Sequence, residues 1–303
     1  MFKFIGYNDG KDLIDKTFTF NGGEEYVKLH DWAFLTGAYS LNFGYKLIAH
    51  LNDSSDVMKL LMINDAFDRL TRDVPRKLDL VIPYLPYARQ DRVCVPGESH
   101  SLAVMAKLIN GCNFNSVTLV DPHSHVAEAL IENVRVVSQL NIIANSEFNE
   151  YVMKNFRDIV LVSPDAGANK KTFEVAKYFS TNFIRADKLR DLTTGQIKET
   201  IVYADDLTGK TAVILDDICD GGRTFIELAK VLKAKGAAKV ILFVTHGIFS
   251  AGLDPLFAGG IDAIWTTDSF PLKDANEAIA REVCTTPDNF HVIPLKEYTR
   301  FKN

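Results

Sequence analysis

The segment TAVILDDICDGGRTFIELAKVLKAK, residues 211–235, carries the clearest structural pattern in the chain. It begins with an apolar run that is typical of a strand buried on both faces of a parallel sheet. Residues 225–235 repeat apolar side chains at helical spacing. The polar residues between these two parts include Asp216, Asp217, Asp220, Gly221 and Gly222. The segment therefore predicts a strand, a glycine turn and a helix in direct succession.

The same order of strand and polar loop recurs along the chain. Further apolar runs that end in polar loops occupy residues 78–85, 116–121, 158–165 and 239–246. Helical patterns lie between them, at residues 101–110 and 170–179. Strands that alternate with helices are typical of doubly wound α/β domains with mainly parallel sheets. In such sheets ligands bind beyond the carboxyl ends of the strands, so we expect the functional residues in these loops.

The strand-and-loop unit appears on both sides of about residue 140, which indicates two domains. We expect an N-terminal domain over residues 1–140 and a C-terminal domain over residues 141–303. The last ~12 residues of the chain are expected to pack back on the first domain. Residues 187–210 are polar and contain two turn signals, so they are interpreted as a long hairpin or a mobile loop.

Composition excludes several classes of protein. The net charge of −5 argues against non-specific binding of nucleic acid. No apolar run reaches the ~18 residues that a membrane-spanning helix needs, so no membrane partner is expected. The N-terminal residues lack the apolar core of a signal peptide. The four cysteines are scattered and form no C-x-x-C pair. They are therefore interpreted as free thiols, and a cytoplasmic location is expected.

The glycine turn after residue 217 has the properties of an anion site. Two glycines at a helix start allow successive N–H groups to face a phosphate, and the helix dipole adds to the attraction. Carboxylates do not bind phosphate, but they accept hydrogen bonds from sugar hydroxyls and hold hydrated Mg²⁺. The combination favours a sugar phosphate. The alternative is an acidic strand end in which Asp220 is the helix N-cap. A P-loop is excluded, because the G-K-T triplet precedes its strand and Ala204 occupies the place of the first glycine.

Three further motifs strengthen this interpretation. They are PYARQDR at residues 86–92, VDPHSH at residues 120–125 and VSPDAGANK at residues 162–170. Together with the glycine turn, these motifs resemble the ribose-phosphate pyrophosphokinase family, whose members have phosphoribosyltransferase-like domains. The resemblance covers most of the chain and implies an enzyme of nucleotide biosynthesis. It implies Mg²⁺-dependent transfer of the diphosphoryl group of ATP to the 1-hydroxyl of ribose 5-phosphate. It also implies a homo-oligomer, either a dimer or a hexamer, with the active site between domains and between subunits.

The resemblance also implies roles for individual residues. The residues expected to bind ATP are Phe20, Glu24, Arg89, Gln90, Asp91 and His123. Those expected to bind ribose phosphate are Asp216, Asp217, Asp220, Gly221, Gly222, Arg223 and Thr224. Those expected near the metal are His123 and Asp165, and those expected to be catalytic are Lys188 and Arg190. The two catalytic cations would neutralise charge on the transferring group, within a loop that closes before the chemistry.

Each assignment has a simpler structural alternative. Arg89 and Asp91 could form a surface ion pair, and Phe20 could be a core residue. Lys188 and Arg190 could belong to a solvated charged face. For the remaining histidines the structural interpretation is preferred: His125 as a loop histidine that bonds to the backbone, and His246 as a residue at a strand end.

Three segments depart from the family pattern. The expected F-S-D-G-E of the adenine loop is FNGGE here, so Gly22 replaces a carboxylate. Residues 93–99, VCVPGES, replace a basic run that serves allosteric control and subunit contacts. In the sugar-phosphate turn, Gly221 replaces a threonine and Arg223 replaces a glycine. The last change leaves a larger acceptor such as ADP-ribose as an alternative to ribose 5-phosphate. A non-catalytic regulatory family member is a further alternative.

Overall fold

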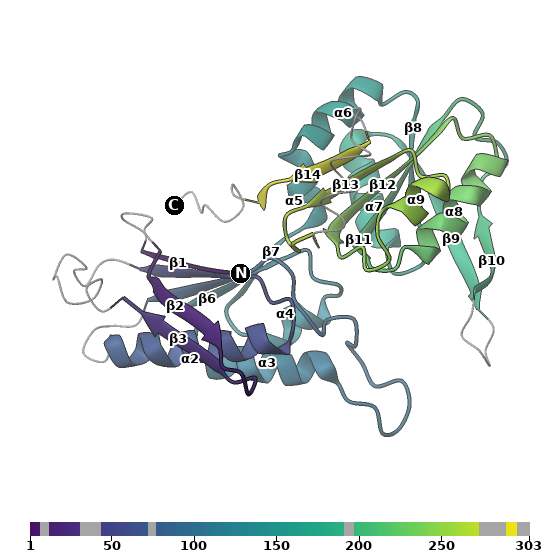
Figure 1. The fold of residues 1–303 in the computed structure, drawn as a ribbon. Helices are drawn as coiled ribbons and strands as arrows, with labels where there is room; N and C mark the ends of the chain where they lie inside the picture. The colour runs from purple at the N-terminus through teal and green to yellow at the C-terminus, as the bar shows by residue number, and fades with distance from the viewer. Residues whose placement is uncertain (7–11, 31–43, 72–76, 191–196, 273–288, 296–303) are drawn as a thin grey trace. The chain divides into compact units, whose positions relative to one another are not determined.

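The computed structural model describes residues 1–6, 12–30, 44–71, 77–190, 197–272 and 289–295. The chain divides into two compact units, of which the first comprises Met1–Val137 and the second begins at Ser138. Both units are α/β with mainly parallel sheets, which confirms the predicted fold class (Figure 1). The expected packing of the last residues of the chain concerns a segment outside the described residues. Within the described residues, no helix is both long and apolar enough to cross a membrane.

The described part of the first unit contains a five-stranded sheet in the order β1–β4–β5–β6–β7. Strand β1 is antiparallel to β4, and the remaining neighbours are parallel. The strands are β1 (Phe2–Gly6), β4 (Tyr45–Ala49), β5 (Leu78–Ile82), β6 (Ser116–Val120) and β7 (Val134–Val137). A separate antiparallel hairpin is formed by β2 (Ile14–Thr19) and β3 (Glu25–Leu29). The helices are α2 (Ser54–Leu70), α3 (Ser101–Gly111) and α4 (Val126–Leu130).

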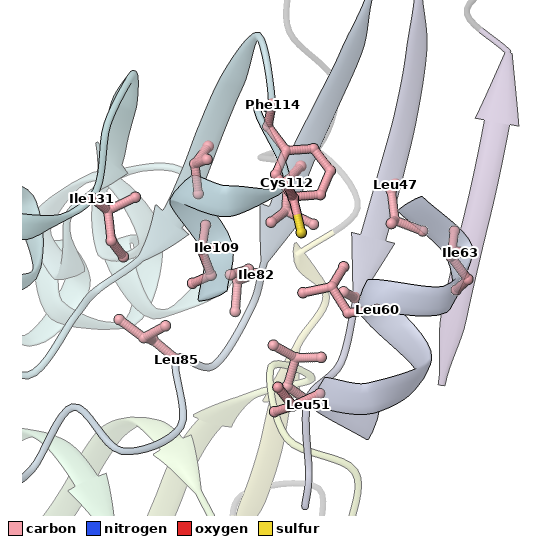
Figure 2. Packing of buried hydrophobic residues seen from close by; sticks show 14 of the residues in the cluster. Leu47, Leu51, Leu60, Ile63, Ile82, Leu85, Ile109, Cys112, Phe114 and Ile131 are labelled. Atoms are coloured by element: carbon pink, nitrogen blue, oxygen red, sulfur yellow. The ribbon is translucent and has the colours of Figure 1, made fainter. Parts of the chain in front are cut away.

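The core of the first unit lies between its helices and the sheet (Figure 2). Leu60 and Ile63 of α2 are three residues apart and therefore lie on the same face of the helix. This face is directed toward the sheet, where both side chains belong to one buried cluster with Leu47 of β4. Helix α3 contributes Ile109 to the same cluster, beside Ile82 at the end of β5. The apolar stripes of the two helices therefore fix both helices on the sheet. This leaves their N-terminal ends next to the loops that leave the carboxyl ends of the strands.

The described part of the second unit contains a seven-stranded sheet in the order β10–β9–β8–β11–β12–β13–β14. Only β10 runs antiparallel to its neighbour. The strands are β8 (Ile159–Ser163), β9 (Asn182–Arg190), β10 (Ile197–Val202), β11 (Thr211–Cys219), β12 (Lys239–Gly247), β13 (Ala263–Thr267) and β14 (Phe290–Ile293). The helices are α5 (Gln139–Ala144), α6 (Glu147–Asn155), α7 (Asn169–Phe179), α8 (Arg223–Ala234) and α9 (Asp254–Ala258).

Both faces of this second sheet are covered, as its continuous apolar strands predict. On one face, Ile214 of β11 packs in a cluster with Leu228 and Leu232 of α8. On the other face, Phe243 of β12 contacts Phe148 of α6, with ring centroids 4.8 Å apart. Burial on both faces explains why these strands lack the alternation of a half-exposed strand.

The polar stretch at residues 187–210 includes the end of β9 and the whole of β10, which pair as an antiparallel hairpin, so the hairpin interpretation is correct. The tip of this hairpin lies outside the described residues.

Candidate functional site

The glycine turn after β11 joins the strand directly to α8 (Figure 1). Gly222, with a φ of +75°, is the N-cap of α8, and its carbonyl accepts hydrogen bonds from the N–H groups of Phe225 and Ile226. The alternative in which Asp220 caps the helix is therefore wrong. A Cβ at Gly222 would lie 2.8 Å from Cδ2 of Leu256, whereas a Cβ at Gly221 would have no heavy atom within 4 Å. Position 222 therefore requires a glycine, whereas a side chain at position 221 would project into open space.

The loop after β12 holds Asp220 in place. The Ser250 hydroxyl donates to Oδ1 of Asp220 over 2.6 Å, and the Ser250 N–H donates to the Asp220 carbonyl over 3.2 Å. The Ile248 N–H donates to the Cys219 carbonyl over 2.9 Å. Sequence reasoning missed Ser250, although its position just after an apolar strand was a usable signal. These contacts tie two neighbouring carboxyl-end loops of the sheet together.

Asp216 and Asp217 form a crowded acidic pair at the end of β11. The Asp217 side chain is buried, and its backbone N–H donates to Oδ1 of Asp216 over 2.9 Å. Burial raises the pKa of Asp216 well above its ordinary value, and the nearby carboxylates of Asp217 and Asp165 raise it further. Such an arrangement is unfavourable for an ionised carboxylate and is relieved by a cation or by hydroxyl donors.

Asp165 reaches this pair from the loop after β8. Its Oδ1 accepts hydrogen bonds from the N–H groups of Gly167 and Ala168, over 3.0 and 3.2 Å, just before α7. The Ser163 hydroxyl donates to its carbonyl over 2.8 Å. The side chain is therefore held in a fixed orientation, close enough to influence Asp216. The structure thus places Asp165 near the acidic pair of Asp216 and Asp217. Nowhere in the described ranges do three or more His, Cys, Asp or Glu side chains gather as a metal site.

The loop after β5 carries three of the predicted ATP residues of the first unit, Arg89, Gln90 and Asp91. Asp91 is buried and accepts two hydrogen bonds from the Arg92 guanidinium, over 2.8 and 3.2 Å. This pairing lowers the pKa of Asp91 to about 2, and the charge of His123 acts in the same direction. Asp91 is not a surface residue, so the surface-pair alternative is wrong for it, and Arg92 is the partner that the sequence did not indicate. His123, in the loop after β6, lies close enough to Asp91 for its charge to act on that carboxylate.

Gln90 is attached to the start of α3. Its Oε1 accepts hydrogen bonds from the hydroxyls of Ser101 and Ser99, and its carbonyl accepts from the Leu102 N–H. Arg89, one residue earlier, is exposed. These hydrogen bonds therefore hold Gln90 against α3, while the Arg89 side chain is exposed to solvent.

Phe20 and Glu24 stand at the base of the turn between β2 and β3, where the Phe20 N–H donates to the Glu24 carbonyl over 2.7 Å. The Phe20 side chain is 49% exposed and meets Phe18 edge-to-face, with ring centroids 4.7 Å apart. The core alternative for Phe20 is therefore wrong, and its ring is available for stacking. Glu24 is also exposed.

A buried acid anchors this hairpin to α2. Glu25 accepts hydrogen bonds from the hydroxyls of Ser55 and Thr19, and Nζ of Lys59 lies 3.5 Å away. The next residue of α2 toward its N-terminus, Ser54, shares a 2.8 Å hydrogen bond with the Tyr87 hydroxyl in the loop after β5. The start of α2 thus links the two segments that contain most of the predicted ATP residues.

The remaining predicted residues are placed as follows. His125 pairs with Glu128, with Nδ1 and Oε1 2.7 Å apart. His246 is buried and shares a 2.8 Å hydrogen bond with Ser269, in agreement with a structural role. Lys188 and Arg190 lie on β9, where Lys188 is the backbone partner of Thr200. Their side chains lie outside the described part of the structure.

Two protein families match this chain, one within each of its two units. Residues 18–112 match the family described as the N-terminal domain of ribose phosphate pyrophosphokinase. Residues 165–285 match the phosphoribosyl synthetase-associated domain. The crystal structure of phosphoribosylpyrophosphate synthetase from Mycobacterium smegmatis has a TM-score of 0.73 at 21% identity, covering 93% of this chain and 86% of that one. The two proteins therefore share their fold.

Curated relatives give the closer sequence evidence. The ribose-phosphate pyrophosphokinase of Granulibacter bethesdensis is 32% identical over 225 residues, covering 73% of this chain and 70% of the relative. The enzyme of the same name from Sulfolobus acidocaldarius is 30% identical over 216 residues, covering 68% of this chain and 72% of the relative. The acidic pair, the glycine turn and these similarities lead to one conclusion. The chain belongs to the ribose-phosphate pyrophosphokinase family.

Proposed function

We propose that this protein transfers the diphosphoryl group of ATP to the 1-hydroxyl of ribose 5-phosphate, which yields phosphoribosyl pyrophosphate and AMP. The observation that carries the proposal is the acidic pair followed by the glycine turn at the start of α8. Carboxylates accept hydrogen bonds from vicinal hydroxyls, and a helix N-terminus favours a phosphate. The printed names of the curated relatives support the same reaction.

In the second unit, Asp216 and Asp217 are proposed to accept hydrogen bonds from the ribose hydroxyls. Asp220, which Ser250 orients, is proposed to lie near the anomeric carbon. The turn from Gly221 to Thr224 is proposed to hold the 5-phosphate with its backbone N–H groups. Arg223 is exposed at the first position of α8 and adds positive charge to this end.

The residues of the second unit suit Mg²⁺. Mg²⁺ prefers oxygen ligands, and Asp165 and Asp216 supply carboxylate oxygens on adjacent strand ends. A cation there would offset the repulsion that raises the pKa of Asp216. His123 is proposed as a second residue near the metal, on the ATP side. When bound, the ion neutralises charge on the diphosphoryl group. Chelation by EDTA is expected to abolish AMP release, and added Mg²⁺ is expected to restore it.

The first unit is proposed to bind ATP. Phe20 supplies a ring that can stack on adenine, and Glu24 lies beside it. Arg89 and Gln90 are proposed to contact the nucleotide directly. Asp91 is proposed to bind ATP with them, and both of its carboxylate oxygens accept hydrogen bonds from the Arg92 guanidinium, which orients that group.

Lys188 and Arg190 are proposed to neutralise charge on the transferring diphosphoryl group and on the leaving AMP. Replacement of one such donor typically costs 10²–10³ in rate. Lys188→Ala is therefore expected to reduce kcat by roughly 10²–10³ while ATP still binds, as measured by AMP release and by calorimetry. The matched control is Lys230→Ala, which removes an exposed lysine of α8. An unchanged kcat for Lys188→Ala would remove this residue from the mechanism.

The function is tested by incubating the purified protein with ATP, Mg²⁺ and ribose 5-phosphate, with AMP release followed by chromatography and the diphosphate ester by ³¹P NMR. We expect AMP in amounts equal to the ester. A parallel reaction contains ADP-ribose in place of ribose 5-phosphate. AMP release only with ADP-ribose would favour the larger acceptor. No AMP with either acceptor would favour the regulatory alternative.

We also propose that the protein is a homo-oligomer, a dimer or a hexamer, which light scattering after gel filtration tests directly. A cytoplasmic location is proposed because the three described cysteines are free thiols, which suits a reducing compartment.

A further inference from the structure

Gln139, the first residue of α5, is a buried amide next to the proposed ribose site. The residue is 2% exposed, which is unusual for glutamine. A buried amide needs hydrogen-bond partners, since an unsatisfied one is costly. Its partners lie in strands β11 and β12, some 77 and 106 residues further along the chain.

The amide holds the backbone of the acidic pair. Nε2 of Gln139 donates to the carbonyl oxygen of Asp216 over 2.6 Å, and it also donates to Oγ1 of Thr245 over 3.3 Å. The other end of the same peptide bond, the Asp217 N–H, donates to Oδ1 of Asp216. Because the peptide group is planar, the Gln139 bond at its carbonyl end orients the whole group, and the bond at its N–H end holds the Asp216 carboxylate to the same group. The directions in which Asp216 and Asp217 project from the strand are fixed with it.

The ladder with β8 ends before the acidic pair. The pairing of β11 with β8 runs from Thr211 to Ile214, two residues before Asp216. Gln139 therefore supplies a donor to a strand carbonyl that lies beyond the end of this pairing. The ladder on the other side of β11 continues past this point, where Asp216 is paired with Val244 of β12.

Gln139 is part of a wider buried network at this end of the sheet. The Thr245 carbonyl accepts hydrogen bonds from the hydroxyls of Thr267 and Ser269, over 2.7 and 3.0 Å. The same Ser269 hydroxyl bonds to Nδ1 of His246. A satisfied buried network of this kind is rigid and specifies one arrangement. It reaches across the ends of β11, β12 and β13 and stops at the acidic pair.

The helix does not need Gln139 for its own start. Helix α5 is capped by Ser138, whose side chain accepts from the Asn141 N–H, while the Asn141 side chain accepts from the Ser138 N–H. Ser138 and Asn141 therefore cap the helix, while Gln139 between them bonds to Asp216. A substitution can therefore remove the bond to Asp216 and keep the helix cap, or remove the cap and keep that bond.

We propose that Gln139 is a positioning residue for the sugar: it orients the Asp216–Asp217 peptide so that both carboxylates meet the ribose hydroxyls. The inference rests on the proposed function. In this proposal Gln139 acts through the peptide group and not by direct contact with the sugar. Its loss is therefore expected to weaken ribose 5-phosphate recognition and leave ATP recognition in place.

The test compares Gln139→Leu, Gln139→Glu and the control Asn141→Ala with the unmodified protein. Leucine removes both donated bonds, and glutamate keeps the shape but loses the N–H donor. Loss of a buried hydrogen bond of this kind is worth about a factor of ten, so we expect both variants to raise the KM for ribose 5-phosphate about tenfold. The KM for ATP is expected to stay within about twofold. Asn141→Ala is expected to lower the melting temperature without moving either KM.

The outcomes separate the inference from the function it rests on. If the unmodified protein releases AMP but Gln139→Leu has an unchanged KM for ribose 5-phosphate, the inference is wrong and the function stands. The same holds if Gln139→Glu behaves like the unmodified protein, or if Asn141→Ala raises that KM equally. If no protein releases AMP, the function fails. The inference is then decided by the melting-temperature increase that ribose 5-phosphate causes, which must be smaller in Gln139→Leu than in the unmodified protein and in Asn141→Ala.

Discussion

Gly221 and Gly222 are neighbours in the turn, but only one of them is fixed by its surroundings. Gly222 has a positive φ and packs against Leu256, whereas Gly221 faces open space. Gly222→Ala is therefore expected to destabilise the protein by about 1–3 kcal/mol and to raise the KM for ribose 5-phosphate. Gly221→Ala is the matched control and is expected to change stability by less than about 0.5 kcal/mol. Urea unfolding measures the free energy of unfolding of both variants, and an equal decrease for the two would contradict this account.

Asp216 is proposed to be needed for the sugar but is costly for the unliganded fold. Because its pKa is raised in the folded state, its ionisation opposes folding once the pH rises above the ordinary carboxyl value of 3.8. Asp216→Asn is therefore expected to be more stable than the unmodified protein, by an amount that grows from pH 4 toward neutrality. It is also expected to lose roughly 10- to 100-fold in kcat/KM for ribose 5-phosphate.

The measurement is the free energy of unfolding in urea at several pH values, with Asp205→Asn as the control because Asp205 is exposed. A stability difference that does not change with pH would show that burial and neighbouring charge are not the cause.

At the scale of elements, the hairpin of β2 and β3 depends on one buried acid. Glu25 bonds to Ser55 and Thr19 and lies near Lys59, whereas its neighbour Glu24 is exposed. The hydrogen bonds, with that of Ser55 first, lower the pKa of Glu25, so its stabilisation is present above the ordinary value of 4.5 and is lost as the pH falls below it. Glu25→Gln is expected to lower the melting temperature by a few degrees at pH 7 and by less at pH 4.

Glu24→Gln is the matched control for this prediction. It is expected to leave the melting temperature unchanged and to raise the KM for ATP. If the two variants melt alike at pH 7, the hairpin is not anchored through Glu25.

Element positions were largely predictable because they depend on local patterns. The strand predicted at residues 211–217 continues for two more residues, to Cys219. The helix predicted at residues 225–235 begins two residues earlier, at Arg223. What the sequence did not indicate are contacts between distant residues, such as that of Gln139 with Asp216. A buried glutamine near a domain boundary has no local pattern that distinguishes it from an exposed one.

The site shows the same limit. The acidic pair, the glycine turn and Asp165 were predictable because each follows an apolar strand. The partner of Asp91 was not, because two arginines flank it and only the backbone geometry selects Arg92. Likewise, the choice of Gly222 over Asp220 as the N-cap depends on a positive φ, which composition alone does not reveal.

At the scale of the molecule, each unit has its own hydrophobic core. Ligand binding stabilises the part of a protein that it contacts, by RT ln(1 + [L]/Kd), or about 2.7 kcal/mol at 100 times the Kd. Ribose 5-phosphate is therefore expected to slow hydrogen exchange in the core strands β8, β11 and β12 by up to about 100-fold. The core strands β5 and β6 of the first unit are expected to respond to ATP. Mass spectrometry of peptides from both units measures this, and equal protection of both by ribose 5-phosphate alone would contradict it.

The buried thiol beneath the turn has a consequence for chemical damage. Cys219 is fully buried, and burial raises the pKa of its thiol, with the carboxylates of Asp216 and Asp220 adding to the effect. Cys94, by contrast, is exposed. Only thiolates react readily with peroxides and maleimides, so Cys94 is expected to be modified while Cys219 stays reduced. In a Cys284→Ser background, a fluorophore can therefore be attached to the first unit while the sugar-phosphate turn escapes oxidation and labelling alike.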